Sequence, residues 1–376
     1  MMVRRCPRLA PSVAFVAMLA LALTLLPPPA PASAALRSAA DSTVGVNGRV
    51  YTIVRAGNRV YIGGDFTSVR TRSGSVTRNH VAAIDATTGD LIGNWNPNAN
   101  NEVRGIAVSP DGGTVYLGGF FTKVGGQSRS RLAAVSAGSG SAIGSWRADA
   151  SSNVYAMAQH GNTLYVGGTF GRVGNSPRRR VAAIAANSGA VRDWRASVDG
   201  WVRSIAVAPN GSRVYFGGKF SSVNGQRRRH LAALTSGGAL TSWSPDGEYL
   251  VFALETSGSQ VFAGVGGPGG RVSAFDGTSG RRNWQTRGDG DVQALGVLDG
   301  RVYAGSHSKT IGGVRQANLA ALRIDNGRVD TSFRPKVNSG PGVWAIDTAS
   351  RRLYAGGDFT RINDRPQERF AQFSAP

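Results

Sequence analysis

The stretch "VYLGGFFTKVGGQSRSRLAAVSAGSGSAIGSW", from Val115 to Trp146, decides the fold of this chain. It contains a β-branched run that ends in a glycine pair, then a basic loop, a small apolar run and a tryptophan, and this order returns along the sequence. Such a period is typical of propellers or solenoids. The first of these glycines, two residues after an aromatic residue, recurs at Gly63, Gly118, Gly167, Gly217, Gly264, Gly305 and Gly356. The aromatic marker recurs at Trp95, Trp146, Trp194, Trp243, Trp284 and Phe333.

Each repeat contains four short β patterns separated by turns such as "SPDGG" and "APNGS", whose Asp-Gly and Asn-Gly pairs suit hairpins. No amphipathic helix pattern interrupts them. Four antiparallel strands in roughly 45 residues describe a propeller blade. We therefore predict an all-β chain folded as a single seven-bladed β-propeller of four-stranded antiparallel blades. The repeats lie near residues 48–98, 103–149, 154–199, 202–246, 249–288, 292–336 and 342–376 plus 35–46.

The two ends of the repeat region fit together. The last repeat stops after "RFAQFSAP", which is its third strand, and residues 35–46 precede the first repeat, where a fourth strand would lie. We predict that this segment completes the seventh blade and so removes exposed sheet edges. We also predict that the tryptophans are packing residues that fill the space beside the glycine pairs.

The N-terminal segment has the pattern of a secretory signal. A basic patch precedes an apolar run from Val13 to Leu26, and the A-x-A triplet at 32–34 follows. The run is shorter than the roughly 20 residues needed to span a bilayer. We predict a signal sequence at 1–34 that is cleaved after Ala34, an extracellular domain at 35–376, and no membrane span in the mature chain. An uncleaved anchor is the alternative.

Composition limits the chemistry of the mature chain. Cys6, the only cysteine, lies inside the predicted signal, so the mature chain has no disulfide and no thiolate metal site. The formal net charge of +21 favours an anionic partner.

Several motifs resemble known propeller families. "GGDFT" at 63–67 and 356–360, "SPDGGTVYLGG" and "VDTSFRP" resemble bacterial delta-60 repeat propellers. A glycine pair followed by tryptophan resembles kelch repeats, and "AAIDATTGDLIGNW" resembles the tryptophan-docking repeats of quinoprotein propellers. The resemblance implies a fold and leaves the activity open, because one propeller fold hosts many functions. The mature chain lacks the cysteine of copper-containing kelch oxidases, and no catalytic residue is carried over.

The sequence was also searched for catalytic and metal-binding patterns. The four histidines have no metal-ligand spacing, and no nucleophile elbow or phosphate-binding loop is present. We therefore predict no metal and no cofactor. Carboxylates do recur just before the innermost strands, where they would surround the mouth of the central channel as a solvated rim or as oxygen ligands for a cation. These channel-mouth candidates are Glu102, Asp199, Glu248 and Asp291, together with Trp201.

Positive charge is concentrated in the loops between the second and third strands. Seven loops, at 66–80, 121–131, 170–180, 220–230, 264–271, 305–318 and 359–369, hold nineteen basic residues and two acidic ones. Strand alternation places these loops on one face, and arginine forks match carboxylate, sulfate and phosphate. The predicted anion-binding residues are Arg70, Arg72, Arg78, Lys123, Arg129, Arg131, Arg178, Arg179, Arg180, Arg227, Arg228 and Arg229. We expect the arginines at 178–180 and 227–229 to be exposed, outside the blade core.

Two functions remain open from the sequence. The favoured one is a secreted, monomeric, non-catalytic binding or scaffold protein for an acidic glycan or cell-envelope polymer. Nucleic acid is disfavoured as the partner, because the chain is predicted to be exported and contains no nucleic-acid module. The alternative is a secreted polysaccharide lyase or hydrolase, which requires a tight cluster of carboxylate, tyrosine or histidine groups at the channel mouth.

Overall fold

The computed structural model describes residues 1–2, 35–338 and 340–376, so nearly all of the predicted signal lies outside the described residues. The described residues form strands and no helices, which confirms the all-β prediction. Within this part of the chain, no helix of sufficient length and apolar character to cross a membrane is found.

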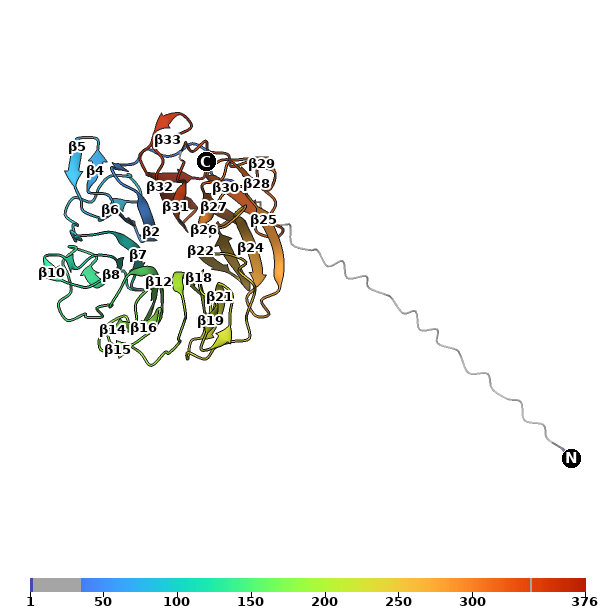
Figure 1. Cartoon of the computed structure of the whole chain (residues 1–376). Helices are drawn as coiled ribbons and strands as arrows, with labels where there is room; N and C mark the ends of the chain where they lie inside the picture. The colour runs from blue at the N-terminus through green and yellow to red at the C-terminus, as the bar shows by residue number, and fades with distance from the viewer. Residues whose placement is uncertain (3–34, 339) are drawn as a thin grey trace. The chain divides into compact units, whose positions relative to one another are not determined.

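Each repeat forms a separate antiparallel sheet in which the second strand lies between the first and the third. The first strands face a common centre (Figure 1). They contact one another in chain order, and the last of them also contacts the first. They are β2 (Val50–Ala56), β7 (Val103–Val108), β12 (Val154–His160), β17 (Trp201–Val207), β22 (Val251–Ser257), β26 (Val292–Leu298) and β31 (Val343–Ala349).

The other two strands of each sheet carry the glycine pairs and the small apolar runs. The middle strands are β3 (Arg59–Gly64), β8 (Thr114–Gly119), β13 (Thr163–Gly168), β18 (Arg213–Lys219), β23 (Gln260–Val265), β27 (Arg301–Ser306) and β32 (Arg352–Gly357). The third strands are β6 (Val81–Asp85), β11 (Leu132–Ser136), β16 (Val181–Ala185), β21 (Leu231–Thr235), β24 (Arg271–Asp276), β30 (Leu319–Arg323) and β35 (Phe370–Ser374).

The predicted fourth strand forms only in the fifth repeat, where β25 (Arg282–Arg287) pairs with β24. In the first repeat it is reduced to a single bridge between Ile84 and Leu91. The chain then turns, and the Trp95 amide donates to the Ile92 carbonyl (3.3 Å). The prediction of four-stranded blades is therefore wrong for the other repeats, because the turn that directs the tryptophan into the core ends the ladder.

The basic loops contain small hairpins that the sequence did not predict. The fifth repeat lacks one, since its glycine-rich connection at 266–270 is short. The hairpins are β4–β5 (Ser68–Thr71, Gly74–Thr77), β9–β10 (Lys123–Val124, Gln127–Ser128), β14–β15 (Arg172–Val173, Ser176–Pro177), β19–β20 (Ser222–Val223, Gln226–Arg227), β28–β29 (Thr310–Ile311, Val314–Arg315) and β33–β34 (Arg361–Ile362, Arg365–Pro366).

The glycine pairs make room for a valine of the next sheet. A Cβ at Gly63 would lie 2.7 Å from Cγ1 of Val103, the fully buried valine at the start of the next inner strand. The same contact relates Gly356 in the last sheet to Val50 in the first (2.5 Å). The first and last sheets are therefore packed on each other. The prediction that tryptophan fills this space is wrong, because the valine occupies it.

The tryptophans instead join consecutive sheets, and their prediction as packing residues is confirmed. Trp95 is fully buried, its ring centroid lies 5.0 Å from that of Tyr61, and its Nε1 donates to the Ser136 carbonyl of the next sheet (3.0 Å). The same bond to the following sheet recurs at Trp146, Trp194, Trp243 and Trp284.

The N-terminal segment lies against the last sheet. The Arg37 amide donates to the Ser374 carbonyl (2.9 Å), and the Asp41 amide donates to the Gln372 carbonyl (2.8 Å). The second bond is equivalent to one in the first repeat, where the Ile92 amide donates to the Ala83 carbonyl of the third strand. The segment ends in β1 (Gly45–Val46), which pairs with β4 of the first repeat. It thus connects the last repeat to the first without forming a strand beside β35.

Candidate functional site

A β-bulge occurs at the same place in all seven inner strands. In β7, Val103 pairs with Gly119 and Gly105 pairs with Gly118, so Arg104 is the extra residue. A bulge re-aims the side chain of that residue, and bulges are over-represented beside functional sites. We call the seven extra residues the bulge ring: Tyr51, Arg104, Tyr155, Arg203, Phe252, Gln293 and Trp344.

The bulge ring surrounds a cavity where the seven inner strands meet. The cavity has a volume of about 160 Å³, and it is lined by residues of all seven strands, including every member of the ring except Phe252. Two guanidinium groups, one amide and three aromatic rings therefore face one small space. The sequence analysis missed this site. Its only signal is a position that varies in chemistry directly after a buried valine in every repeat.

Arg104 is a compensated cation. Its guanidinium lies 2.5 Å from the Glu102 carboxylate, and its Cζ lies 3.5 Å from the centroid of the Tyr51 ring. The carboxylate neutralises the charge, and the ring adds a cation–π contact. Glu102, a predicted channel-mouth residue, thus lies beside the cavity as the partner of Arg104.

Arg203 is different, because it makes neither an ion pair nor a hydrogen bond to any residue that the structure describes. Its guanidinium lies 4.9 Å from the Tyr155 ring centroid and 5.9 Å from that of Phe252. It is half-buried, and it lines the cavity. Burial, assisted by the nearby positive charge of Arg104, lowers the pKa of Arg203 to about 10, although Tyr155, Tyr51 and Glu102 oppose the shift. An uncompensated, desolvated cation thus faces the channel.

The other channel-mouth candidates are not brought together. Asp199 is exposed; burial opposes its ionisation, but hydrogen bonds from Ser221 and Ser222 prevail and lower its pKa to about 2. Glu248 pairs with Arg271 and with Arg282.

Asp291 accepts a hydrogen bond from the Gly267 amide (2.8 Å), and Trp201 is 51% exposed. Among residues 35–338 and 340–376, no three His, Cys, Asp or Glu side chains gather as metal ligands would. The cluster that the enzyme alternative requires is therefore not formed by these residues.

Four of the predicted anion-binding arginines are structural. Arg129 is fully buried and donates to the carbonyls of Ser128 (2.8 Å) and Ile143 (3.1 Å). These bonds join the loop to the outer segment of the same repeat. Burial lowers the pKa of Arg129. Equivalent bonds, each to the preceding carbonyl and to the outer segment, are made by Arg78, Arg178 and Arg228.

The prediction that Arg178 is exposed is therefore wrong, because its donors serve carbonyls of its own repeat. Arg180 is half-buried and donates to the Thr169 and Phe170 carbonyls. Arg131 is also half-buried and has a left-handed backbone (φ 66°) in the corresponding turn. The position of these two arginines is thus explained by the turn in which they lie and not by a ligand.

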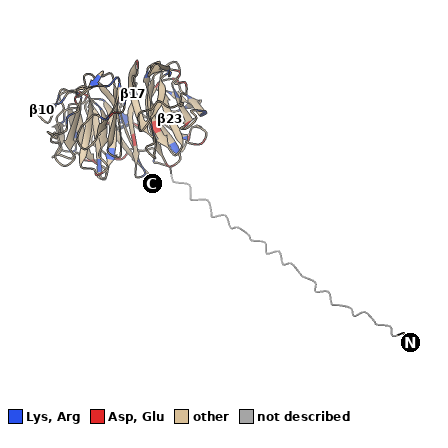
Figure 2. Cartoon of the chain, turned by 90° about the horizontal axis from the view of Figure 1, so that it is seen from below, with Lys and Arg blue, Asp and Glu red and all other residues tan. Residues whose placement is uncertain are grey.

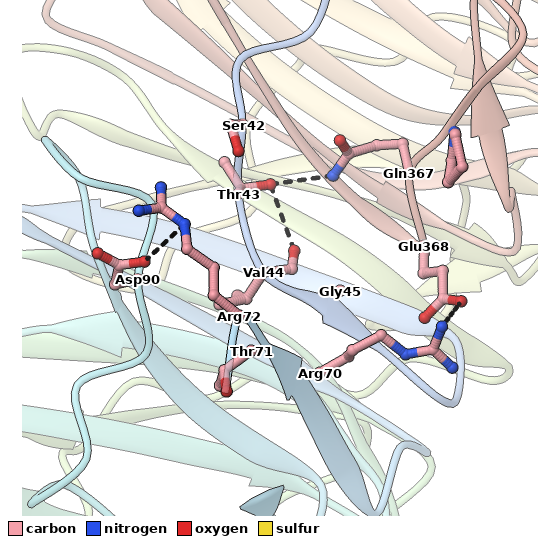
Figure 3. A pocket seen from close by; sticks show the side chains of 11 residues that line it. Ser42, Thr43, Val44, Gly45, Arg70, Thr71, Arg72, Asp90, Gln367 and Glu368 are labelled. Carbon is pink, nitrogen blue, oxygen red and sulfur yellow. Dashed lines mark hydrogen bonds and ion pairs between the residues drawn. The ribbon is translucent and has the colours of Figure 1, made fainter. Parts of the chain in front are cut away.

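Arg70 and Arg72 lie at a second cavity, of about 210 Å³, where the N-terminal segment meets β4 and the last repeat (Figure 3). Arg70 pairs with Glu368 (2.8 Å), and Arg72 lies 3.8 Å from Asp90. Carboxylates thus offset both positive charges at this junction.

The exposed and uncompensated cations form a smaller set than predicted. Lys123, Arg179 and Arg227 are exposed and make no ion pair with any described residue, whereas Arg229 pairs with Asp246 (2.9 Å). Arg172, which the sequence analysis did not select, is also exposed and unpaired in the described chain. In Figure 2, blue segments occur at both edges of the sheets, so basic residues as a whole are not confined to one edge.

Two carboxyl groups lie at one repeat position in β22 and β31. Burial, assisted by the nearby Asp347 carboxylate, raises the pKa of Glu255 to about 8. Burial also raises the pKa of Asp347, although its Oδ2 accepts a hydrogen bond from the Arg55 amide (2.5 Å).

These shifts predict that Glu255→Gln changes how stability depends on pH. The unfolded-state pKa of a glutamate is about 4.3. Between that value and about 8, the folded state keeps a proton that the unfolded state releases, so stability falls as pH rises through this window. We expect Glu255→Gln to raise the free energy of unfolding at pH 8 more than at pH 5 in urea titrations. The exposed control Asp364→Asn should not change this difference, and equal effects of Glu255→Gln at both pH values would contradict the prediction.

Comparisons with known proteins add evidence on the fold. No protein-family model matches the chain, and no curated protein matches its sequence. Among solved structures, the computationally designed Ika8 protein is similar over 88% of this chain and 98% of its own, with a TM-score of 0.53 and 15% sequence identity. At this identity the similarity concerns the fold alone.

Proposed function

We propose that this chain is a secreted, non-catalytic binding protein that recognises an acidic glycan or cell-envelope polymer. The observation that carries the proposal is a group of exposed cations without ion-pair partners among the described residues, in the loops between the second and third strands of the second, third and fourth repeats. They are Lys123, Arg172, Arg179 and Arg227. Lys123 and Arg172 occupy the same position in neighbouring hairpins. A polymer with several anionic groups is the partner that cations on adjacent repeats suit.

The scaffold that we propose is a single seven-bladed β-propeller closed by residues 35–46, related to delta-60 repeat propellers. Three contacts support ring closure: β31 against β2, the Gly356 backbone against Val50, and the Asp41 amide with the Gln372 carbonyl. A closed ring would hold neighbouring hairpins at a fixed spacing, and such preorganisation favours binding.

Paired variants test the binding surface. Arg179→Ser with Arg227→Ser should weaken binding to heparin at low salt by about fivefold, since exposed ion pairs contribute about 0.2–1 kcal/mol each. The effect should shrink as salt rises, because screening acts within roughly 8 Å at physiological ionic strength. The control pair is Arg281→Ser with Arg328→Ser, two exposed arginines outside the hairpins. Equal losses in both pairs would mean that net charge alone drives retention, and the proposal would fail.

A further inference from the structure

The central cavity contains unmatched hydrogen-bonding groups of both kinds. Nε1 of Trp344 is buried and has no acceptor among the described residues, and Oε1 of Gln293 is buried without a donor. The Gln293 amide is held in place on its other side, where Nε2 lies 3.3 Å from Nδ1 of His307. Buried polar atoms without partners are rare in native proteins, and each one calls for an explanation.

The charge of the cavity is also unbalanced. Glu102 neutralises Arg104 within 2.5 Å, whereas Arg203 has no described partner and feels the repulsion of Arg104. A half-buried cation without an ion-pair partner destabilises a fold unless something offsets it. The aromatic faces of Tyr155 and Phe252 offset it only in part, since a cation–π contact contributes about 0.5–2 kcal/mol.

The volume of the cavity matches a small ring compound. The cavity measures about 160 Å³. A cavity of roughly 150 Å³ accommodates one six-membered ring. Aromatic rings from Tyr51, Tyr155 and Trp344 line the same space. Their apolar faces suit a compact ring more than a flexible chain.

From these features we infer that the central cavity binds one sugar acid, a six-membered ring that carries a carboxylate and hydroxyl groups. The carboxylate pairs with Arg203, and the sugar ring packs against the aromatic side chains of Tyr51, Tyr155 and Trp344 that line the cavity. This site is separate from the hairpin cations and does not depend on polymer binding there.

Calorimetric titration of the mature chain tests the inference with D-glucuronate, D-glucose and acetate as probes. We expect D-glucuronate to bind at least tenfold more tightly than glucose, which lacks the carboxylate, and than acetate, which lacks the ring. No binding of glucuronate, or equal affinity for glucose, would overturn the inference. Affinity for acetate equal to that for glucuronate would exclude the sugar acid in favour of a simple carboxylate site.

A second test uses Arg203→Gln, with the exposed Arg281→Gln as the matched control. Arg203→Gln should weaken glucuronate binding at least tenfold, whereas the control should leave it unchanged. Without ligand, Arg203→Gln should melt at the temperature of the unaltered chain or above it, because it removes an uncompensated charge. A melting temperature several degrees lower would assign Arg203 a structural role, and unchanged glucuronate affinity would exclude it from the site. Either result overturns the inference, whatever the heparin experiment shows.

Discussion

Replacing Trp243 by alanine should lower the free energy of unfolding by about 3–5 kcal/mol, the range for buried tryptophan truncations. The side chain is fully buried, and its ring centroid lies 5.0 Å from that of Tyr215 and 6.2 Å from that of Phe275. Its Nε1 donates to the Asp276 carbonyl of the next sheet (2.9 Å). Truncation therefore removes packing against both sheets, through Tyr215 and Phe275, and a hydrogen bond to the next sheet. Denaturant unfolding followed by circular dichroism measures the loss.

Trp201→Ala is the matched control, because this tryptophan is 51% exposed at the start of β17. Surface substitutions usually change stability by about 0.5 kcal/mol or less. Similar losses at Trp201 and Trp243 would contradict the conclusion that the repeated tryptophans hold consecutive sheets together.

Removing residues 35–46 should produce the other large effect. The segment buries Leu36, Val44 and Val46, and full burial of such a side chain contributes about 1.5–3 kcal/mol. Its loss also removes the partners of the Gln372 and Ser374 carbonyls. We expect a chain that begins at residue 47 to melt about 5–12 °C below one that begins at Ala35.

Arg37→Ala provides the control within the same segment, since it removes a largely exposed ion pair with Asp41 and one exposed hydrogen bond to Ser374 but no buried apolar side chain. Such pairs contribute about 0–1 kcal/mol. If the truncated chain melts at the temperature of the chain that begins at Ala35, the segment does not stabilise the junction between the first and last repeats.

The sequence was sufficient to predict the number of repeats, the order of their strands and the packing role of the tryptophans. It predicted a fourth strand in more repeats than have one. Apolar residues such as Leu91 and Ile92 look like a strand in the sequence whether they form a full ladder or a single bridge before a turn. That outcome depends on where the tryptophan must point, which only the neighbouring sheet determines.

The candidate site was harder to predict, for two physical reasons. A bulge breaks strict alternation, so Arg104 and Arg203 look like solvent-facing strand residues in the sequence although they face the cavity. Charge counting also cannot separate a buried arginine that serves carbonyls, such as Arg129, from an exposed one such as Arg227. Recurrence was the available clue: an arginine three residues before the third strand in four repeats indicates a structural need.

The bulge gives the scaffold an unusual capacity for change. Each inner strand has a fully buried valine directly before the bulge, exemplified by Val50 and Val202, and the next residue is tyrosine, arginine, phenylalanine, glutamine or tryptophan. Side chains of different size, charge and aromaticity thus share one backbone conformation. Evolution, or a laboratory library randomised at seven codons, can sample new specificities there while the valine contacts that hold the sheets together stay the same. In each repeat, the residue that faces the cavity thus follows the residue that packs the sheets together, and the first can change while the second stays the same.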